Sequence, residues 1–536
     1  MKIVFLLRHA LYLRNFENAL RELAMRSHEI LIVFSPWQKP VDKTLLSALM
    51  REYPNIREQR IAPRTGWWWP VSDAARAMRD FLRYLEPTYD DAPALVARGA
   101  RRLPPWIVWA FRHFSWLKSG PVRHALARLI RLVDRIIVPD PGLVQALIEW
   151  SPDLLLVTSV IETRYHQTDY IKAARSLGIP TVLTVPSWDN LTNKGLIQLC
   201  PERVVLWNAI QEREAIEMHG VPATRIYKTG AQLFDHWFEM TPSVNKARFC
   251  ARAGALDPTR PIIIYLCSST FVCSNEVDFV KEWLSHLRQF PDAGISSANV
   301  IVRPHPAHVA QWKDVELTDG GPSVIWPREG GPPLDKVRKR DYFDSLYHAS
   351  AVVGVNTSGF IEAGIVGRRA FALATDHFRA TQEGTLHFRY LVEGGLVETA
   401  ENFDEHFTQL ANAIASPDEV QQKVREFIAM FVRPEGVNSS ATSLFVEAVE
   451  SAITLKPQTW TTPLYAPLLR AAIWPLAFVV RRQVLARLNR GIAGGTEAIG
   501  SLVFLAEGEF AARQLTADGS EARLSLQDPT KMRRAI

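Results

Sequence analysis

Short apolar runs that alternate with amphipathic helical stretches constrain the fold of this chain more than any other feature. Residues 3–7 form an apolar run, residues 15–26 place apolar side chains on one helical face, and residues 30–34 form a second apolar run. A strand, a helix and a strand within about 34 residues make a βαβ unit. Its two strands are parallel and joined by a right-handed crossover. The start of the chain therefore predicts a doubly wound α/β sheet.

The same pattern recurs in two sets. We expect further strands of the first set at residues 154–159, 181–185, 203–207 and 226–229, and strands of the second set at residues 261–267, 299–303, 323–326, in the run that begins at Ser350, and at 370–374. The 536 residues exceed the roughly 250–300 that a single core supports. We predict a Rossmann-like domain at 1–240 with a helical insertion at about 63–139, a linker near 240–245, a second Rossmann-like domain at 241–455, and a basic, partly disordered helical tail at 456–536.

The composition is that of an ordinary globular protein, with 47% hydrophobic and 22% charged residues. The first apolar run is too short for a signal peptide, and no stretch reaches the ~18 uncharged apolar residues of a membrane span. The four cysteines show neither a CxxC pair nor metal-ligand spacing. We therefore expect free thiols and a cytoplasmic protein.

Two blocks of the chain combine bases with large apolar side chains. Residues 98–135 contain Trp106, Trp109 and Trp116 and a single acid, and residues 451–496 contain no acid. The bases of the two blocks are Arg98, Arg101, Arg102, Arg112, Lys118, Arg123, Arg128, Arg131 and Arg135, and Lys456, Arg470, Arg481, Arg482, Arg487 and Arg490. This mixture favours an anionic membrane surface over a nucleic acid as partner. Packing of both blocks on the body of the protein is the alternative.

The run from Ser350 ends in Asn356, Thr357, Ser358 and Gly359, after which a short helix of small residues begins. Hydroxyls and backbone N–H groups at a helix start favour an anion, and a glycine lets the backbone approach a ligand closely. These residues predict a diphosphate site. An ordinary helix cap followed by a turn glycine is the other interpretation.

Two motifs carry a resemblance to a known superfamily. The sequence Arg303-Pro304-His305-Pro306 and residues 356–367 resemble the donor motifs of capsule Kdo transferases and CDP-glycerol glycerophosphotransferases, which belong to the GT-B glycosyltransferase superfamily. They are also similar to those of UDP-N-acetylglucosamine 2-epimerases. The resemblance covers about residues 1–455. It implies two Rossmann-like domains that face a cleft, with a nucleotide-activated donor held by the second domain.

The resemblance also implies roles for single residues. An acid at the position of Glu362 commonly holds the ribose hydroxyls of the donor in GT-B proteins; a stabilising charge in the first helical turn is the alternative. From the residues themselves, Arg303 and His305 could neutralise the leaving phosphate; a structural role of the histidine is the alternative. The other candidate donor contacts follow predicted strands and are Ser268, Ser269, Thr270 and His387.

The general base is open among three residues. An inverting transferase needs a carboxylate or a histidine to accept the proton of the acceptor hydroxyl, and Asp189, Glu162 and His9 each lie near the end of a predicted strand. Each of them could instead cap a helix or bind a sugar. Because no DxD-type motif stands out in the loops after the strands, we expect neither a metal nor a cofactor.

Together these features predict a glycosyltransferase that moves a sugar or a polyol phosphate from a nucleotide donor to a surface-polysaccharide or lipid-linked acceptor, at the inner face of the cell membrane. The glycerophosphotransferases carry an Asp-Tyr-Ser-Ser motif where this chain has Asn356-Thr357-Ser358-Gly359, which favours a sugar nucleotide. A 2-epimerase of sugar nucleotides and a non-catalytic nucleotide- or polymer-binding module are the alternatives.

Overall fold

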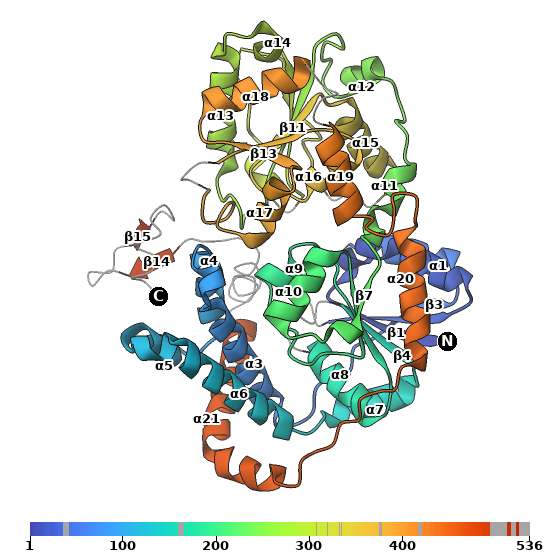
Figure 1. Cartoon of the computed structure of the whole chain (residues 1–536), viewed down its shortest axis with the longest axis vertical. Coiled ribbons are helices and arrows are strands. Elements are labelled where there is room, and N and C mark those ends of the chain that lie inside the picture. Colours follow the sequence, from blue (N-terminus) through green and yellow to red (C-terminus); the bar gives the residue numbers. More distant parts are fainter. Residues whose placement is uncertain are drawn as a thin grey trace. The chain divides into compact units, whose positions relative to one another are not determined.

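The computed structural model describes residues 1–35, 42–158, 166–306, 308–318, 320–331, 333, 335–374, 378–415, 421–493, 512–515 and 521–524. They divide into two compact units (Figure 1). The N-terminal unit contains Met1–Asp235 and a later segment that begins at Phe431, and the C-terminal unit contains His236–Met430. Each unit has its own parallel sheet, so the prediction of two tandem Rossmann-like domains is confirmed.

The sheet of the N-terminal unit has the strand order β3-β2-β1-β4-β5-β6-β7, with every neighbouring pair parallel. Its strands are β1 (Lys2–Leu7), β2 (Glu29–Phe34), β3 (Ile56–Gln59), β4 (Leu154–Thr158), β5 (Thr181–Thr184), β6 (Arg203–Leu206) and β7 (Ile226–Lys228). Its helices are η1 (Ala10–Asn15), α1 (Glu17–Met25), α2 (Thr44–Glu52), α3 (Trp69–Tyr84), η2 (Pro87–Tyr89), α4 (Pro93–Ala100), α5 (Pro105–His113), η3 (Ser115–Lys118), α6 (Gly120–Ile136), α7 (Pro141–Trp150), α8 (His166–Ser176), α9 (Asn190–Asn193), α10 (Ala209–His219), η4 (Ala223–Arg225), η5 (Gln232–Phe234), α20 (Ala441–Glu450), η7 (Ser451–Thr454) and α21 (Ala466–Ala493).

The strands of this sheet are buried on both faces. In β1, Ile3, Phe5 and Leu7 enter one core, which is closed by α1, α2 and α20. Val4 and Leu6 enter a second core, which is closed by α7, α8 and α10. Side chains alternate between the two faces of a strand, so a continuous apolar run is required where helices cover both faces.

The sheet of the C-terminal unit has the order β10-β9-β8-β11-β12-β13, again all parallel. Its strands are β8 (Ile262–Leu266), β9 (Asn299–Arg303), β10 (Ser323–Ile325), β11 (Ala351–Gly354), β12 (Ala370–Leu373) and β13 (Val397–Ala400). The helices from residue 235 to 431 are α11 (Asp235–Glu239), α12 (Lys246–Arg252), α13 (Glu276–Gln289), α14 (Ala293–Ser296), η6 (Val309–Trp312), α15 (Lys336–His348), α16 (Gly359–Ile365), α17 (Leu386–Glu393), α18 (Phe403–Ala415) and α19 (Gln421–Phe431). Later in the chain, β14 (Ala512–Leu515) and β15 (Glu521–Leu524) form an antiparallel pair; most of the tail beyond Gly491, for which we predicted disorder, lies outside the described residues.

Two edge strands are absent from the sequence prediction. β3 reads IREQ and β13 reads VETA, and each pairs with one neighbour only. An edge strand keeps one polar side, so it lacks the apolar run that marks a central strand. The central strands were predicted because they are apolar throughout.

The last helices return to the N-terminal unit. The rings of Phe445 on α20 and Phe16 lie 6.0 Å apart, and Arg26 pairs with Glu450 at 2.8 Å. The apolar face of α20 completes the core on one side of the first sheet. The observed division therefore differs from the predicted boundaries, which assign residues 431–455 to the second domain and make the helical tail a separate part.

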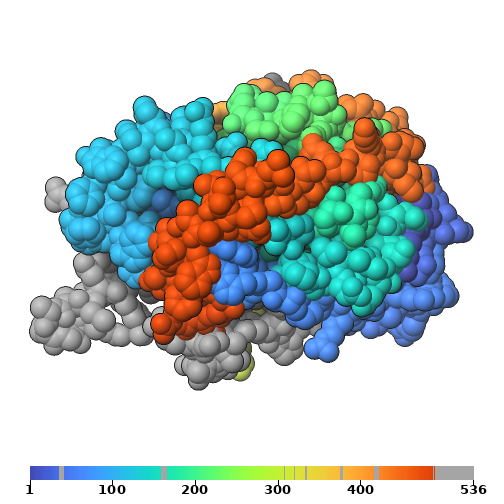
Figure 2. All heavy atoms as spheres, turned by 90° about the horizontal axis from the view of Figure 1, so that it is seen from below, coloured from blue at the N-terminus to red at the C-terminus, as the bar shows by residue number. Residues whose placement is uncertain are grey.

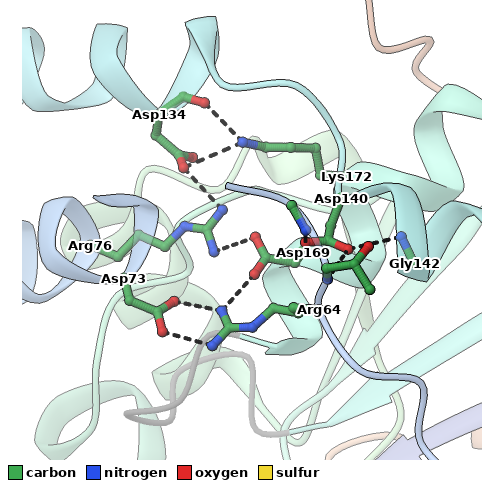
Figure 3. A network of polar contacts seen from close by, with 10 residues as sticks. Arg64, Asp73, Arg76, Asp134, Asp140, Gly142, Asp169 and Lys172 are labelled. Atoms are coloured by element: carbon green, nitrogen blue, oxygen red, sulfur yellow. Dashed lines mark hydrogen bonds and ion pairs between the residues drawn. The ribbon is translucent and has the colours of Figure 1, made fainter. Parts of the chain in front are cut away.

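The helical insertion consists of α3, α4, α5 and α6, and a network of buried charges attaches it to the sheet (Figure 3). Arg76 on α3 donates to Asp169 on α8 at 2.7 Å and pairs with Asp134 on α6 at 2.9 Å. Arg64 makes two hydrogen bonds of 2.8 Å to Asp73 and a third to Asp169. Charges taken out of water must be paired, and this network pairs them between the insertion and the core of the unit.

Lys172 completes the network from α8. Its ammonium group donates to the backbone carbonyl of Asp134 at 2.8 Å and lies 4.7 Å from the ring of Trp460. Burial alone would raise the pKa of the Asp134 and Asp169 carboxyls, but the neighbouring cations hold it below its ordinary value. Both carboxylates are therefore charged at neutral pH.

We predict that Asp169→Asn lowers the free energy of unfolding at neutral pH by about 3–5 kcal/mol, because it leaves Arg64 and Arg76 buried with one carboxylate fewer. Since the folded-state pKa of Asp169 is depressed, its stabilisation is present above the unfolded value of 3.8 and is lost as the pH falls below it. Urea denaturation followed by tryptophan fluorescence measures both effects.

Asp91→Asn is the matched control, because Asp91 belongs to the same insertion and is exposed. We expect it to change the free energy of unfolding by less than about 0.5 kcal/mol. Equal stability of the Asp169 and Asp91 variants would contradict the role given to the network.

Candidate functional site

The candidate site lies at the point where the strand order of the C-terminal sheet reverses. From β8 the chain continues through α13 to β9 on one side, and from β11 it continues through α16 to β12 on the other. Right-handed crossovers direct these two helices to opposite faces of the sheet, and open parallel sheets bind ligands at the carboxyl ends of the strands at such a point. We call the region around the loops after β8 and β11 the crevice. The two loops are residues 268–270, after β8, and residues 356–358, after β11.

Asn356 joins the loops of the crevice. Its backbone N–H donates to the hydroxyl of Ser268 at 3.4 Å, and its side-chain amide donates to the carbonyl of Thr381 at 3.0 Å. Gln382, also buried, donates to the carbonyl of Val355 at 2.7 Å. Ser268 and Asn356 are themselves buried. They hold the loops in place, whereas Ser269, Thr270 and the residues after Asn356 reach the surface.

The start of α16 has a particular geometry. Ser358 is exposed and its side chain makes no capping hydrogen bond, while the hydroxyl of Thr357 accepts from the N–H of Gly359 at 3.2 Å. A Cβ on Gly359 would lie 2.4 Å from Leu266 Cδ1 and 3.0 Å from the hydroxyl oxygen of Tyr342. A larger residue at this position would therefore displace the side chain of Leu266, so the glycine allows α16 to pack closely against β8 and α15.

Glu362 points from α16 toward α15. The hydroxyl of Tyr342 donates to its Oε2 at 2.5 Å. The guanidinium of Arg303 lies 4.8 Å from the ring of Tyr342, donates to the hydroxyl of Ser345 at 2.9 Å and pairs with Asp341 at 3.5 Å. Burial lowers the pKa of Arg303 despite the carboxylate of Asp341. Arg303 is thus held by α15, and Tyr342 connects it with Glu362.

The two candidate histidines lie at an end of β9 and at the start of α17. His305 is half-buried after β9, and its backbone carbonyl accepts from the N–H of His308 at 2.8 Å. His387 is buried in the first turn of α17. The residue before that helix, Thr385, accepts from the amide of Asn356 at 3.5 Å, so α17 begins beside the crevice.

Glu276 was not predicted and is the most unusual titratable group at this edge of the sheet. It opens α13, is fully buried, and accepts from the N–H of Ser268 at 2.7 Å and from the hydroxyl of Tyr265 at 3.2 Å. Burial raises the pKa of Glu276 to about 7, although both donors oppose the rise. The sequence signal is an acid in the first turn of a helix, which is common on exposed helices and does not reveal burial.

The candidate bases belong to the N-terminal unit, and Glu162 lies outside the described residues. His9 is buried after β1, with its ring 4.9 Å from that of Tyr12. Asp189, after β5, accepts from Ser187 at 2.5 Å and from Asn193 at 2.6 Å. The carboxylate of Asp189 is thus engaged within its own loop.

The helical insertion holds the loop that contains Asp189. Arg83 on α3 donates to the carbonyls of Leu191, at 3.1 Å, and of Lys194, and the hydroxyl of Tyr84 donates to the carbonyl of Asn193 at 3.2 Å. Three backbone carbonyls of one loop are therefore bound by two neighbouring side chains of α3. Within the described part of the chain, no three His, Cys, Asp or Glu side chains gather as a metal site would need.

Among known proteins, this chain resembles solved structures in fold, without a match in sequence to a family model or a curated protein. Solved structures that match include a putative UDP-N-acetylglucosamine 2-epimerase from Listeria monocytogenes, with 11% identity over 85% of this chain and 98% of that chain and a TM-score of 0.49. The UDP-GlcNAc 2-epimerase from Neisseria meningitidis matches with 10% identity over 84% of this chain and 100% of that chain and a TM-score of 0.48.

A glycosyltransferase from Rickettsia africae ESF-5 matches with 12% identity over 84% of this chain and 98% of that chain and a TM-score of 0.47. The matches thus include both glycosyltransferases and 2-epimerases. The fold is defined by the strand orders of this chain: two tandem Rossmann-like units, the architecture that the GT-B resemblance implied.

We predict that the stability of the C-terminal unit falls as the pH rises through about 7, because the raised folded-state pKa of Glu276 favours its protonated form. The stabilisation is complete below the ordinary glutamate pKa of 4.5 and is lost above the folded-state pKa of about 7. The free energy of unfolding should fall by about 3 kcal/mol over this range. Glu276→Gln, which is neutral at every pH, should remove this part of the pH dependence. Urea denaturation at several pH values measures it.

Glu282→Gln is the matched control, because Glu282 lies on the exposed side of the same helix. It should leave the pH dependence as it is in the natural protein. A Glu276→Gln variant with an unchanged slope would show that Glu276 is not the titrating group.

Proposed function

We propose that this protein is a nucleotide-dependent glycosyltransferase whose donor binds at the crevice of the C-terminal unit. One observation carries the proposal: the loop predicted to bind a diphosphate, at 356–359, and the loop with the candidate donor contacts, at 268–270, flank the reversal of strand order. Open parallel sheets bind ligands at such a point. The exposed hydroxyl of Ser358 and the loop of Ser269 and Thr270 would then face the diphosphate.

Glu362 would hold the ribose of the donor. Its carboxylate is half-buried beside the crevice and is oriented by the hydroxyl of Tyr342 at 2.5 Å. A carboxylate with fixed oxygens is a suitable acceptor for two neighbouring hydroxyls. His305, after the next strand, would contribute a cation or a hydrogen-bond donor to the leaving phosphate.

The acceptor would bind to the N-terminal unit. Asp189 and His9 both follow strands of that sheet at its carboxyl edge, which is where a base has to lie to reach an acceptor hydroxyl. The loop of Asp189 is held by α3, which favours a fixed binding surface over a flexible turn. We propose a surface-polysaccharide or lipid-linked acceptor and a location in the cytoplasm at the inner face of the cell membrane.

We predict that UDP, CDP, CMP or GDP raises the melting temperature of the protein, and that Glu362→Gln and Ser358→Ala reduce the shift without lowering the melting temperature of the free protein. Ser358 is exposed and Glu362 half-buried, so neither change opens a cavity. No stabilisation by any of these nucleotides would refute the transferase. Formation of the 2-epimer from UDP-N-acetylglucosamine without an acceptor would assign the same site to an epimerase.

Tyr342→Phe tests the orientation of Glu362. The variant keeps the ring beside Arg303 and removes only the hydrogen bond to Glu362. Nucleotide affinity should therefore fall by about two- to twelvefold, which corresponds to the roughly 0.5–1.5 kcal/mol of one hydrogen bond. Tyr347→Phe on the same helix is the control, because Tyr347 is exposed. Isothermal titration calorimetry measures the dissociation constants of the nucleotide. Equal dissociation constants for the Tyr342→Phe and Tyr347→Phe variants would contradict the role of the Tyr342 hydroxyl in orienting Glu362.

A further inference from the structure

Large aromatic side chains of the insertion lie on the outside of the N-terminal unit. Trp106 and Trp109 on α5 are 53% and 54% exposed, and Trp116 on η3 is 60% exposed. Phe114, between them, is also exposed. Exposing an indole ring to water costs free energy in proportion to its exposed apolar area. Monomeric proteins therefore rarely expose several such rings on one surface.

The helix α21 carries a second set of exposed apolar side chains. Leu468 is 76% and Leu476 60% exposed, and Phe478 and Val479 are exposed as well. There is no charged residue from Ala471 to Val480. Only a narrow part of this helix is covered by the protein, so most of its apolar surface faces outward.

The two sets lie on helices of the N-terminal unit that share a neighbour, because both α21 and η3 pack against α6. Ala477 of α21 is buried against Val71 and Ile137, and Arg481 donates to the carbonyl of Trp67 at 2.6 Å. The helix α21 packs against α3 and α6, and η3 packs against α6 and α5. Figure 2 shows α21 running over the outside of the unit beside the insertion. We call α5, η3 and the outward side of α21 the basic aromatic surface.

The two segments that carry this surface are rich in bases and nearly free of acids. Arg112 and Lys118 flank the exposed tryptophans, and Arg481 and Arg482 follow the apolar stretch of α21. The only acid between Arg98 and Arg135 is Asp134, which is buried in the charge network with Arg76. The helix α21 has no acid at all. The two segments that carry the surface therefore supply exposed apolar rings and bases, and Asp134 is their one acid.

We propose that the basic aromatic surface docks on an anionic lipid bilayer, with α5 and α21 lying in the interface. Amphipathic helices bind in this way when apolar side chains enter the acyl boundary and bases meet anionic headgroups, and tryptophan prefers that depth. No helix among the described residues is long and apolar enough to cross a membrane, so the apolar stretch of α21 is suited to lie in the interface. The inference does not require the proposed transfer reaction.

Docking has a consequence inside the N-terminal unit. The insertion whose outer side carries the tryptophans also holds the loop of Asp189 through Arg83 and Tyr84. A docked insertion therefore orients that loop relative to the membrane. If the proposed function is correct, a lipid-linked acceptor would be delivered to this loop by the same contact.

Sedimentation of the full-length protein with lipid vesicles tests the proposal. We expect binding to vesicles of equal parts phosphatidylglycerol and phosphatidylcholine that is at least about tenfold tighter than binding to phosphatidylcholine alone and that weakens with salt. Charge reversal of Arg112, Lys118 and Arg482 to Glu should weaken it by at least about tenfold, because each base near an anionic surface contributes about a factor of five. The double changes Trp109→Ser with Trp116→Ser, and Leu476→Ser with Phe478→Ser, should weaken it comparably.

Met25→Ser with Val337→Ser is the matched control, because both residues are exposed and apolar but lie outside the surface. Quenching of tryptophan fluorescence by bromine-labelled acyl chains gives a second measurement on the natural protein, for which no variant has to fold. Quenching supports the proposal, and its absence overturns it. Equal binding of the surface variants and the control, or a dimer of the free protein that the surface variants dissociate, would also overturn it. Nucleotide binding is measured separately, so failure of the transferase proposal and failure of docking are distinguishable.

Discussion

The burial of parallel strands on both faces is the constraint on which the rest of this structure depends. In β1, side chains that alternate along the strand enter two different cores, and each core needs its own layer of helices. With helices on both sides, the strand order has to reverse somewhere in each sheet. In the C-terminal sheet it reverses between β8 and β11. The loops with Ser268 and Asn356 lie at that place, and the candidate site follows from how the strands are covered.

The insertion depends on a different interaction. Its attachment to the N-terminal sheet uses paired charges, with Arg76 between Asp134 and Asp169. A buried ion pair is stable only when its charged atoms are close together and well oriented. These pairs therefore fix the orientation of α3 and α6 more strictly than apolar contact would. The orientation of α3 fixes the loop after β5 through Arg83. The exposed side of the insertion remains available for a surface such as a bilayer.

The sequence predictions of the site differ in how closely they match the structure. Residues after the predicted strands do gather at one edge of the C-terminal sheet, because the carboxyl ends of parallel strands share an edge. Gly359 has a packing role that the sequence did not predict, since Leu266 and Tyr342 lie where a Cβ would be. Glu276 and Tyr342 were missed. Their importance comes from burial beside Ser268 and contact with Glu362, and neither can be read from residue type.

The sequence by itself determined the two-sheet α/β architecture, because short apolar runs that alternate with amphipathic helices at βαβ spacing are typical of parallel sheets covered on both faces. It also predicted a helical insertion at about 63–139, and it contains the distribution of bases and tryptophans. Only the tertiary structure decided the edge strands, the return of α20 and α21 to the N-terminal unit, and which charges are buried. The physical reason is that the local pattern of apolar residues shows which faces of a strand or helix must be buried. Which other element buries them depends on contacts between residues far apart in the chain.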